Sequence, residues 1–199
     1  NLTSIIIPLN QGWNIISGIS QPYAIDNILD PENIINPGTI YGFEQTYFSA
    51  DFLYPGKGYW INTNSDGEIQ MSSQSLAQSI YPGSKNNKKM NLMYYENQEL
   101  VFGNDLESNR SYFYDLPPKP PYNSKDIRFK DNLRACFDNE CYFDIQNNNE
   151  PVILEFNLND NKSWELIPIA DGGTYNLDEL IYIKNEIRYN LGSTFNKFI

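Results

Sequence analysis

The chain has 199 residues, of which 40% are hydrophobic and 15% aromatic, and it carries a net charge of −11 without a single histidine. This acidic balance argues against nucleic-acid binding, which needs basic contacts to phosphate, and no apolar run is long enough to insert into a membrane. The absence of histidine excludes Ser-His-Asp and Cys-His catalytic systems and histidine metal ligands, so catalysis would have to rest on carboxylates alone.

Short β-branched and aromatic runs recur about every ten residues, with turn residues between them, which is typical of an all-β protein. In the first part of the chain, the expected strands are residues 3–8, 13–17, 39–44, 47–48, 58–63 and 68–71. Asp30, Pro31 and Glu32 have the order of a helix start and predict one short helix. A second short helix is expected over residues 22–29.

Residues 72–89 are rich in Ser, Gln, Asn and Lys, which predicts a linker or crossing segment at a domain boundary. Strands are expected again at residues 90–95, 99–103, 111–115, 126–129, 133–137, 141–145, 151–157, 163–167, 180–184 and 186–190. Their hairpin-like spacing predicts an antiparallel β-sandwich over residues 90–199. The expected fold is therefore all-β with minimal helix, a compact Trp-anchored module over residues 1–71 preceding the sandwich.

The two cysteines, Cys136 and Cys141, are separated by four residues that include an Asp-Asn turn signal. A tight hairpin would bring the two sulfur atoms to facing positions. We favour a disulfide, and two buried thiols are the alternative. A disulfide would indicate an oxidising compartment.

The aromatic residues near the second tryptophan are candidates for ligand binding. In one interpretation, which we favour, Trp13 and Trp60 both belong to the core of the first module. In the other, Trp60, Tyr59 and Tyr54 form a surface that stacks on sugar rings. Because side chains alternate along a strand, Tyr59 and Trp60 are expected to point to opposite faces.

An oxygen-rich segment with Asn62, Asn64 and Asp66 matches the start of a calcium-binding loop. The glutamate that such a loop needs at its twelfth position is replaced by Ser73. A hairpin turn explains the same residues. We therefore expect no cofactor and keep calcium as the alternative.

Carboxylates are the remaining candidates for catalysis, because a glycosidase needs only two of them. The candidates are Glu44, Asp51, Glu96, Glu99, Asp105 and Glu107. No spacing in the sequence pairs any two of them at a defined distance, so we expect no enzyme activity.

A proline-rich segment, Pro117-Pro118-Lys119-Pro120-Pro121, must be extended, because each proline fixes its φ angle and lacks an N–H group. We favour a rigid crossover between two sheets. A ligand for an aromatic groove is the alternative.

The order of these motifs resembles a known kind of module. Gly12-Trp13-Asn14, then Pro55-Gly-Lys-Gly-Tyr-Trp60, then the proline-rich segment, then Asp126-Ile-Arg-Phe129 resembles the β modules of large secreted and surface proteins. Such proteins occur in marine bacteria and in bacteria that use type IX secretion, and some large DNA viruses have similar modules. The resemblance implies secretion or surface display and names no reaction. The chain departs from the usual ending of this family, because residues 190–199 show no clear sorting signal.

The expected function is that of a non-catalytic accessory or adhesion module of an extracellular or cell-surface protein. Its partner would be a polysaccharide or a surface protein, with no nucleic acid and no membrane insertion. The alternative is a structural component of a virion, a surface layer or an extracellular filament, which would self-associate through its N-terminal strand. A carboxylate-dependent glycoside hydrolase is the third hypothesis.

Overall fold

A computed structural model describes residues 4–72, 90–103, 108–147, 150–160, 162–169, 181–183, 187–191 and 197–199. In this part of the chain the regular elements are β-strands and short 3₁₀ helices, which confirms the expected all-β class. None of the helices in the described ranges is long and apolar enough to cross a membrane.

The chain divides into two compact units. The first comprises Asn1–Glu44 and Phe48–Asn86, and the second comprises Gln45–Tyr47 and Asn87–Ile199. The linker that the sequence predicts over residues 72–89 lies, apart from Ser72, outside the described residues. The two units are described separately below.

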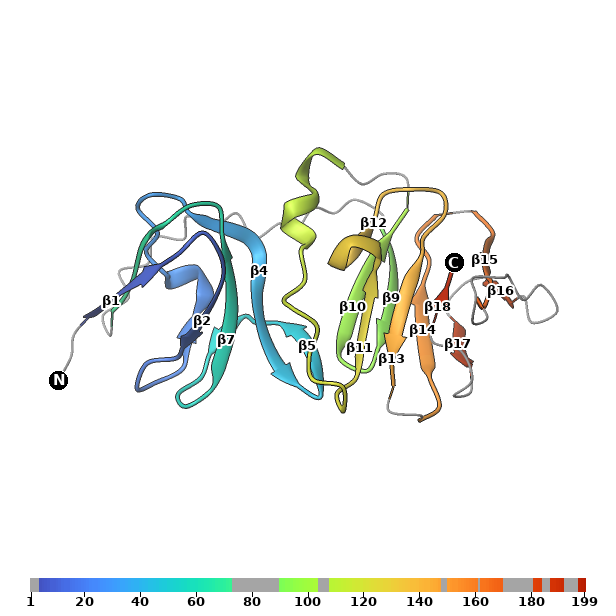
Figure 1. Cartoon of the computed structure of the whole chain (residues 1–199), viewed down its shortest axis with the longest axis horizontal. Helices are drawn as coiled ribbons and strands as arrows, with labels where there is room; N and C mark the ends of the chain where they lie inside the picture. The colour runs from blue at the N-terminus through green and yellow to red at the C-terminus, as the bar shows by residue number, and fades with distance from the viewer. Residues whose placement is uncertain are drawn as a thin grey trace. The chain divides into compact units, whose positions relative to one another are not determined.

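The first unit is built on a four-stranded sheet with the order β2-β7-β4-β5, accompanied by the pairs β1-β8 and β3-β6 (Figure 1). β2 and β4 each pair antiparallel with β7, and β8 pairs antiparallel with β1. The strand bounds are β1 Ser4–Leu9, β2 Gly12–Ser17, β3 Tyr23–Ala24, β4 Ile35–Glu44, β5 Thr46–Ser49, β6 Phe52–Leu53, β7 Gly58–Thr63 and β8 Gly67–Ser72.

The core of the first unit forms on one face of this sheet, because side chains alternate along each strand. On β7, Tyr59 and Ile61 are buried, whereas Trp60 between them is partly exposed. The buried cluster consists of Leu9, Ile16, Tyr23, Ile28, Ile34, Ile35, Ile40, Ala50, Leu53, Tyr59, Ile61, Ile69 and Met71. Trp13 and Trp60 are not among them, so the expected place of both tryptophans in the core is wrong.

The helix expected from Asp30 onward is also wrong. The Asp30 carboxylate accepts the backbone N–H groups of Ile34 and Ile35 at 2.9 and 2.8 Å, which closes a turn instead of capping a helix. Asn33 has a positive φ of 55°, which a helix does not allow. Of the helix expected over residues 22–29, only the short 3₁₀ helix η1, Ile25–Asn27, forms.

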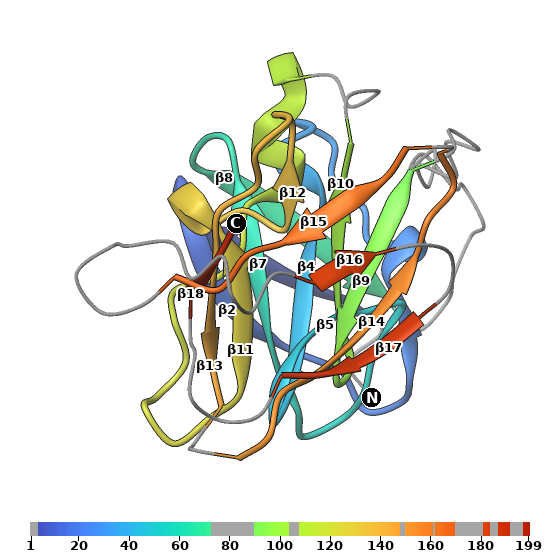
Figure 2. The same ribbon diagram turned by 90° about the vertical axis from the view of Figure 1, so that its right-hand side faces the viewer.

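The second unit contains a five-stranded sheet, β12-β10-β9-β14-β17, a three-stranded sheet, β11-β13-β18, and the pair β15-β16 (Figure 2). Its ladders are antiparallel except that β12 runs parallel to β10. The bounds are β9 Asn91–Tyr95, β10 Gln98–Phe102, β11 Asp126–Phe129, β12 Ala135–Cys136, β13 Phe143–Gln146, β14 Ile153–Asn157, β15 Trp164–Leu166, β16 Ile181–Ile183, β17 Ile187–Asn190 and β18 Lys197–Phe198.

One buried cluster joins the two larger sheets of this unit, which gives it a sandwich-like core. Leu100 and Leu154 of the five-stranded sheet and Ile127 of the three-stranded sheet all belong to it, and each is 0% exposed. The strand expected at residues 111–115 is wrong, because the 3₁₀ helix η2, Ser108–Tyr114, occupies this segment. A short 3₁₀ helix η3, Lys130–Asn132, follows β11.

Two polar or covalent links cross between the larger sheets. The buried Gln98 of β10 donates its amide N–H to the Ile127 carbonyl at 2.5 Å and accepts the Ile127 N–H at 3.1 Å. The expected disulfide between Cys136 and Cys141 is confirmed, with the two Cα atoms 5.7 Å apart. The expected hairpin is wrong, because β12 pairs with β10 while β13 pairs with β11 and β18. The disulfide therefore connects β12 of one sheet to the segment that leads into β13 of the other.

The proline-rich segment is bound to its own unit through backbone carbonyls. Arg128 donates to the Pro117 carbonyl at 3.1 Å. Gln146 donates to the carbonyls of Pro121 and Ser124 at 2.8 and 2.7 Å. These bonds fix the segment before β11, as the crossover interpretation requires.

Candidate functional site

The outer face of the four-stranded sheet, opposite the core of the first unit, carries a group of large apolar side chains. Trp60 on β7 has Ile15 of β2 and Tyr41 of β4 as its cross-strand neighbours. The Trp13 ring is perpendicular to that of Trp60, with centroids 6.3 Å apart, and lies 6.1 Å from the Tyr41 ring. Phe43 follows Tyr41 by two residues and therefore faces the same side. We name Trp13, Ile15, Phe43 and Trp60 the outer platform.

The outer platform is accessible to solvent. Ile15 is 65% exposed and Phe43 40% exposed, and both tryptophans are partly exposed. Gly58 lies two residues before Trp60 on β7 and therefore faces the same side of the sheet. A Cβ atom built on Gly58 would meet only the Ile15 side chain, at 3.8 Å. The missing side chain at Gly58 therefore leaves room beside the Trp60 ring. Contiguous exposed apolar side chains of this kind mark interaction surfaces.

An ion pair borders the outer platform. Lys57 precedes Gly58 and Glu44 follows Phe43, and the Lys57 ammonium donates to the Glu44 carboxylate. This hydrogen bond and the charge of Glu44 raise the pKa of Lys57. Both side chains are about half exposed, at 52% and 55%, so they also present hydrogen-bonding groups to solvent. Because the two charges compensate each other, the edge of the platform is polar without a net charge.

The three rings predicted to stack on sugars do not lie together. Tyr59 is 2% exposed in the core, and its hydroxyl accepts the Tyr54 N–H at 2.9 Å, so the prediction that Tyr59 is a stacking ring is wrong. Tyr54 is 48% exposed and pairs with Phe52, at a centroid distance of 6.4 Å. Trp60 alone reaches the outer platform. The alternation of side chains along β7 is the physical reason, since Tyr59 and Trp60 must face opposite sides.

The sequence analysis missed Ile15 and Phe43 as surface residues. The signal for Ile15 was its spacing of two residues from Trp13, which places both on one face of a strand. The spacing of Phe43 from Tyr41 places these two on one face of a strand, but only the pairing of β4 with β7, in which Tyr41 lies opposite Trp60, brings that face beside Trp60. Spacing alone does not reveal which strands pair.

The predicted calcium ligands serve the turn between β7 and β8. The Asp66 carboxylate accepts the Gln11 N–H at 2.7 Å, and the Asn64 amide donates to the Asn33 carbonyl at 3.1 Å. Asn62 is 6% exposed on β7. Within the described ranges, no group of three or more acidic, cysteine or histidine side chains is placed to hold a metal ion. The hairpin expected at these residues is wrong, because β7 pairs with β2 and β4 whereas β8 pairs with β1. The side chains of Asp66 and Asn64 instead fasten the turn between two sheets to distant parts of the first unit.

Three of the candidate catalytic carboxylates lie beside basic side chains. Glu44 pairs with Lys57, Glu96 with Lys125 at 2.6 Å, and Glu99 lies 3.9 Å from Arg134. Asp105 and Glu107 lie outside the described residues. The geometry of the three described pairs is that of surface ion pairs.

No protein-family model matches this chain, and searches among curated proteins and solved structures find no similar protein. The fold and the outer platform define an all-β protein with an exposed aromatic surface. Its function is argued below from that surface.

Proposed function

We propose that the chain is a non-catalytic binding module of an extracellular or cell-surface protein, and that its outer platform binds a glycan. The observation that carries this proposal is the row of Trp13, Trp60 and Ile15 across β2 and β7, in which Ile15 is 65% exposed and both tryptophans are partly exposed. Aromatic rings offer a large apolar face at a small entropic cost, and such faces can cover the C–H side of a sugar ring. The disulfide supports the proposed oxidising location.

The ion pair beside the outer platform favours a neutral glycan over a charged one as the ligand. Lys57 and Glu44 neutralise each other, so neither an acidic nor a basic sugar gains an unpaired counter-charge there. Both side chains can still exchange hydrogen bonds with hydroxyl groups. The net charge of −11 also opposes anionic polysaccharides.

The test is calorimetric titration with soluble neutral polysaccharides, a β-glucan and an α-mannan, against the wild type and two variants. Ile15→Ser removes an apolar side chain that is 65% exposed, so the fold should be retained. Trp60→Ala removes the ring itself. We expect each variant to lose at least about tenfold in affinity, equivalent to about 1.4 kcal/mol.

Phe52→Ala is the matched control, because it removes an exposed ring of the same unit that is not part of the platform. It should bind like the wild type. The proposal fails if the wild type binds neither polysaccharide, or if Ile15→Ser and Phe52→Ala bind equally well.

A second candidate function is structural, as a subunit that assembles through β1. Among the described strands β1 pairs only with β8, so within the described residues no strand occupies its other edge. Ile5 and Ile6 on it are 41% and 58% exposed. An open apolar edge strand is a template for pairing with another chain. Sedimentation velocity should show association that rises with concentration and is lost in Ile6→Lys, and a wild type that stays monomeric at high concentration excludes this candidate.

A further inference from the structure

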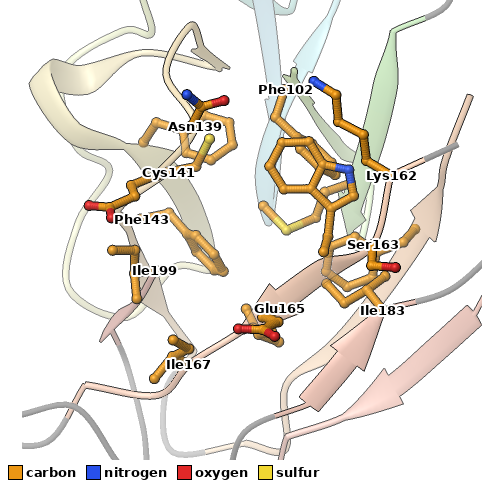
Figure 3. A pocket seen from close by; sticks show the side chains of 16 residues that line it. Phe102, Asn139, Cys141, Phe143, Lys162, Ser163, Glu165, Ile167, Ile183 and Ile199 are labelled. Atoms are coloured by element: carbon orange, nitrogen blue, oxygen red, sulfur yellow. The ribbon is translucent and has the colours of Figure 1, made fainter. Parts of the chain in front are cut away.

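The second unit contains an open cavity of about 360 Å³, which lies within the size range of small-molecule sites (Figure 3). Its walls come from both larger sheets and from the β15-β16 pair. The buried lining residues are Met93, Phe102, Phe129, Phe143, Phe156, Leu166 and Ile183, each between 2% and 6% exposed. The interior of the cavity is therefore apolar and mainly aromatic.

Trp164 is held in place on one wall of the cavity. Its ring is perpendicular to that of Phe102, with centroids 4.9 Å apart. Its indole N–H donates to the two carboxylate oxygens of Asp160 at 3.2 and 3.3 Å, and Asp160 in turn accepts the Asn91 amide at 2.7 Å. Because the polar atom of the indole is already bound, the ring offers carbon surface to a ligand. A wall fixed before binding lowers the entropic cost of binding.

The mouth of the cavity is polar. Asn139, Glu140, Lys162, Ser163 and Glu165 line it and are all exposed. In Figure 3, Asn139, Cys141 and Phe143 lie on one side of the cavity, and Phe102, Lys162 and Ser163 lie on the other. The disulfide of Cys141 ties the first side to β12 of the five-stranded sheet.

The charges at this mouth favour a cation. Glu140 and Glu165 line the mouth with a single lysine, Lys162, and the positive charge of Lys162 also acts on the Asp160 carboxylate. The mouth therefore carries two carboxylates and one ammonium group, which leaves it with a net negative charge. A cation that enters would also meet aromatic faces, to which cations are attracted.

We propose that this cavity binds a small aromatic ligand with a positively charged end, an arylalkylamine in chemical class. The aromatic part of the ligand lies among Phe102, Phe143 and Trp164, and its ammonium group lies at the mouth, near Glu140 and Glu165. The site belongs entirely to the second unit, so it does not depend on glycan binding by the outer platform.

The test uses three probes that share one ring: tryptamine, indole and indole-3-propionate, titrated by calorimetry into the full chain. We expect tryptamine to bind with one-to-one stoichiometry and at least tenfold more tightly than indole-3-propionate, with indole in between. Added salt should reduce the difference in affinity between tryptamine and indole-3-propionate, because salt screens exposed charges.

Variants at exposed positions test separately how the cavity binds the ammonium group and how it admits the aromatic ring, and they leave the buried core unchanged. Glu140→Gln combined with Glu165→Gln should abolish the preference for tryptamine and leave indole binding unchanged. Ser163→Trp should close the mouth and weaken all three probes at least tenfold. Glu155→Gln is the control, since Glu155 is exposed on β14 and is not part of the lining.

The proposal is overturned if no probe binds saturably, if tryptamine and indole-3-propionate bind equally, or if Ser163→Trp has no effect. Its failure is distinguishable from failure of the proposed glycan function, because Ile15→Ser should leave tryptamine binding unchanged. Likewise, Ser163→Trp should leave polysaccharide binding unchanged.

Discussion

Asp126 and Arg128, two residues apart on β11, form a buried ion pair with two parallel hydrogen bonds. Arg128 Nε lies 2.5 Å from Asp126 Oδ2, and Nη2 lies 2.7 Å from Oδ1. Arg128 also donates to the Pro117 carbonyl at 3.1 Å and to the Asn132 side chain at 3.2 Å. One guanidinium group thus joins β11, the proline-rich segment and the turn after β11.

Loss of this arginine should destabilise the protein strongly. Arg128→Met leaves the Asp126 carboxylate buried without its partner, which costs about 3 to 5 kcal/mol of unfolding free energy. Arg188→Met is the control, because Arg188 and its partner Glu155 are 67% and 55% exposed. It should cost less than about 1 kcal/mol. Urea unfolding followed by circular dichroism measures both, and similar costs for the two variants would contradict the prediction.

Replacement of Tyr95 by phenylalanine should make the protein more resistant to alkali. The Tyr95 ring is 1% exposed, and its hydroxyl has no hydrogen-bond partner within the described part of the chain. Burial raises the pKa of Tyr95 to about 12, with smaller effects from the charges of Lys125, Glu96, Glu150 and Asp126.

Because the folded pKa of Tyr95 lies above its unfolded value of about 10, its neutral form contributes fully to stability below pH 10. This contribution is lost as the pH rises from about 10 to 12. Tyr95→Phe should therefore unfold at a higher pH than the wild type in an alkaline titration, and its stability at pH 7 should change by less than about 1 kcal/mol. Identical alkaline midpoints would refute this.

Asp160 should make the wall of the cavity sensitive to acid. Burial alone would raise the pKa of Asp160, but hydrogen bonds from Asn91, Trp164 and the Lys162 backbone outweigh it and lower the pKa. Its ionised form therefore stabilises the protein above the unfolded pKa of about 4, and this contribution is lost as the pH falls through the lower folded pKa.

Asp160→Asn should remove this acid dependence and cost about 1 to 2 kcal/mol at pH 7, because it weakens bonds to a charged acceptor. Tryptophan fluorescence across pH 2 to 6, compared between variant and wild type, follows the change, because Trp164 is one of the three tryptophans that give the signal. The prediction fails if both proteins show the same acid transition.

Reduction of the disulfide should destabilise the second unit moderately. Cys136 and Cys141 are only five positions apart, so the bond closes a short loop and is worth about 2 kcal/mol by loop entropy. Urea unfolding with and without dithiothreitol measures this difference. The Cys136→Ser/Cys141→Ser variant is the control and should not respond to dithiothreitol. A wild type that is equally stable in both conditions would contradict the prediction.

Two glycines of the four-stranded sheet should respond differently to alanine. A Cβ on Gly42 would lie 2.3 Å from the Phe48 ring, whereas a Cβ on Gly58 would meet only Ile15 at 3.8 Å. Gly42→Ala should cost about 1 to 3 kcal/mol through overpacking. Gly58→Ala should change stability by less than about 0.5 kcal/mol. Thermal unfolding of both variants measures the contrast, and equal midpoints would rule out the close contact at Gly42.

Local patterns predicted a large part of the strands. Residues 58–63 and 126–129 form β7 and β11 with the expected bounds. The aromatic-rich residues 111–115 were misleading, because their β propensity is overridden by tertiary contacts. Tyr114 packs its ring 5.6 Å from that of Phe137, and the Arg134 guanidinium lies 5.1 Å from its ring. Such contacts between distant residues are invisible in a short window of sequence.

By itself, the sequence determined the all-β class, the opposite faces of Tyr59 and Trp60, and the two cysteines close enough to bond. Each of these follows from the covalent geometry of one strand or one short loop. The tertiary structure decided that Trp13 and Trp60 meet on the outer face, that the disulfide connects β12 to the segment before β13, and that aromatic rings from three sheets line a cavity. These depend on which strands pair, and strand pairing is set by the burial of residues far apart in the chain.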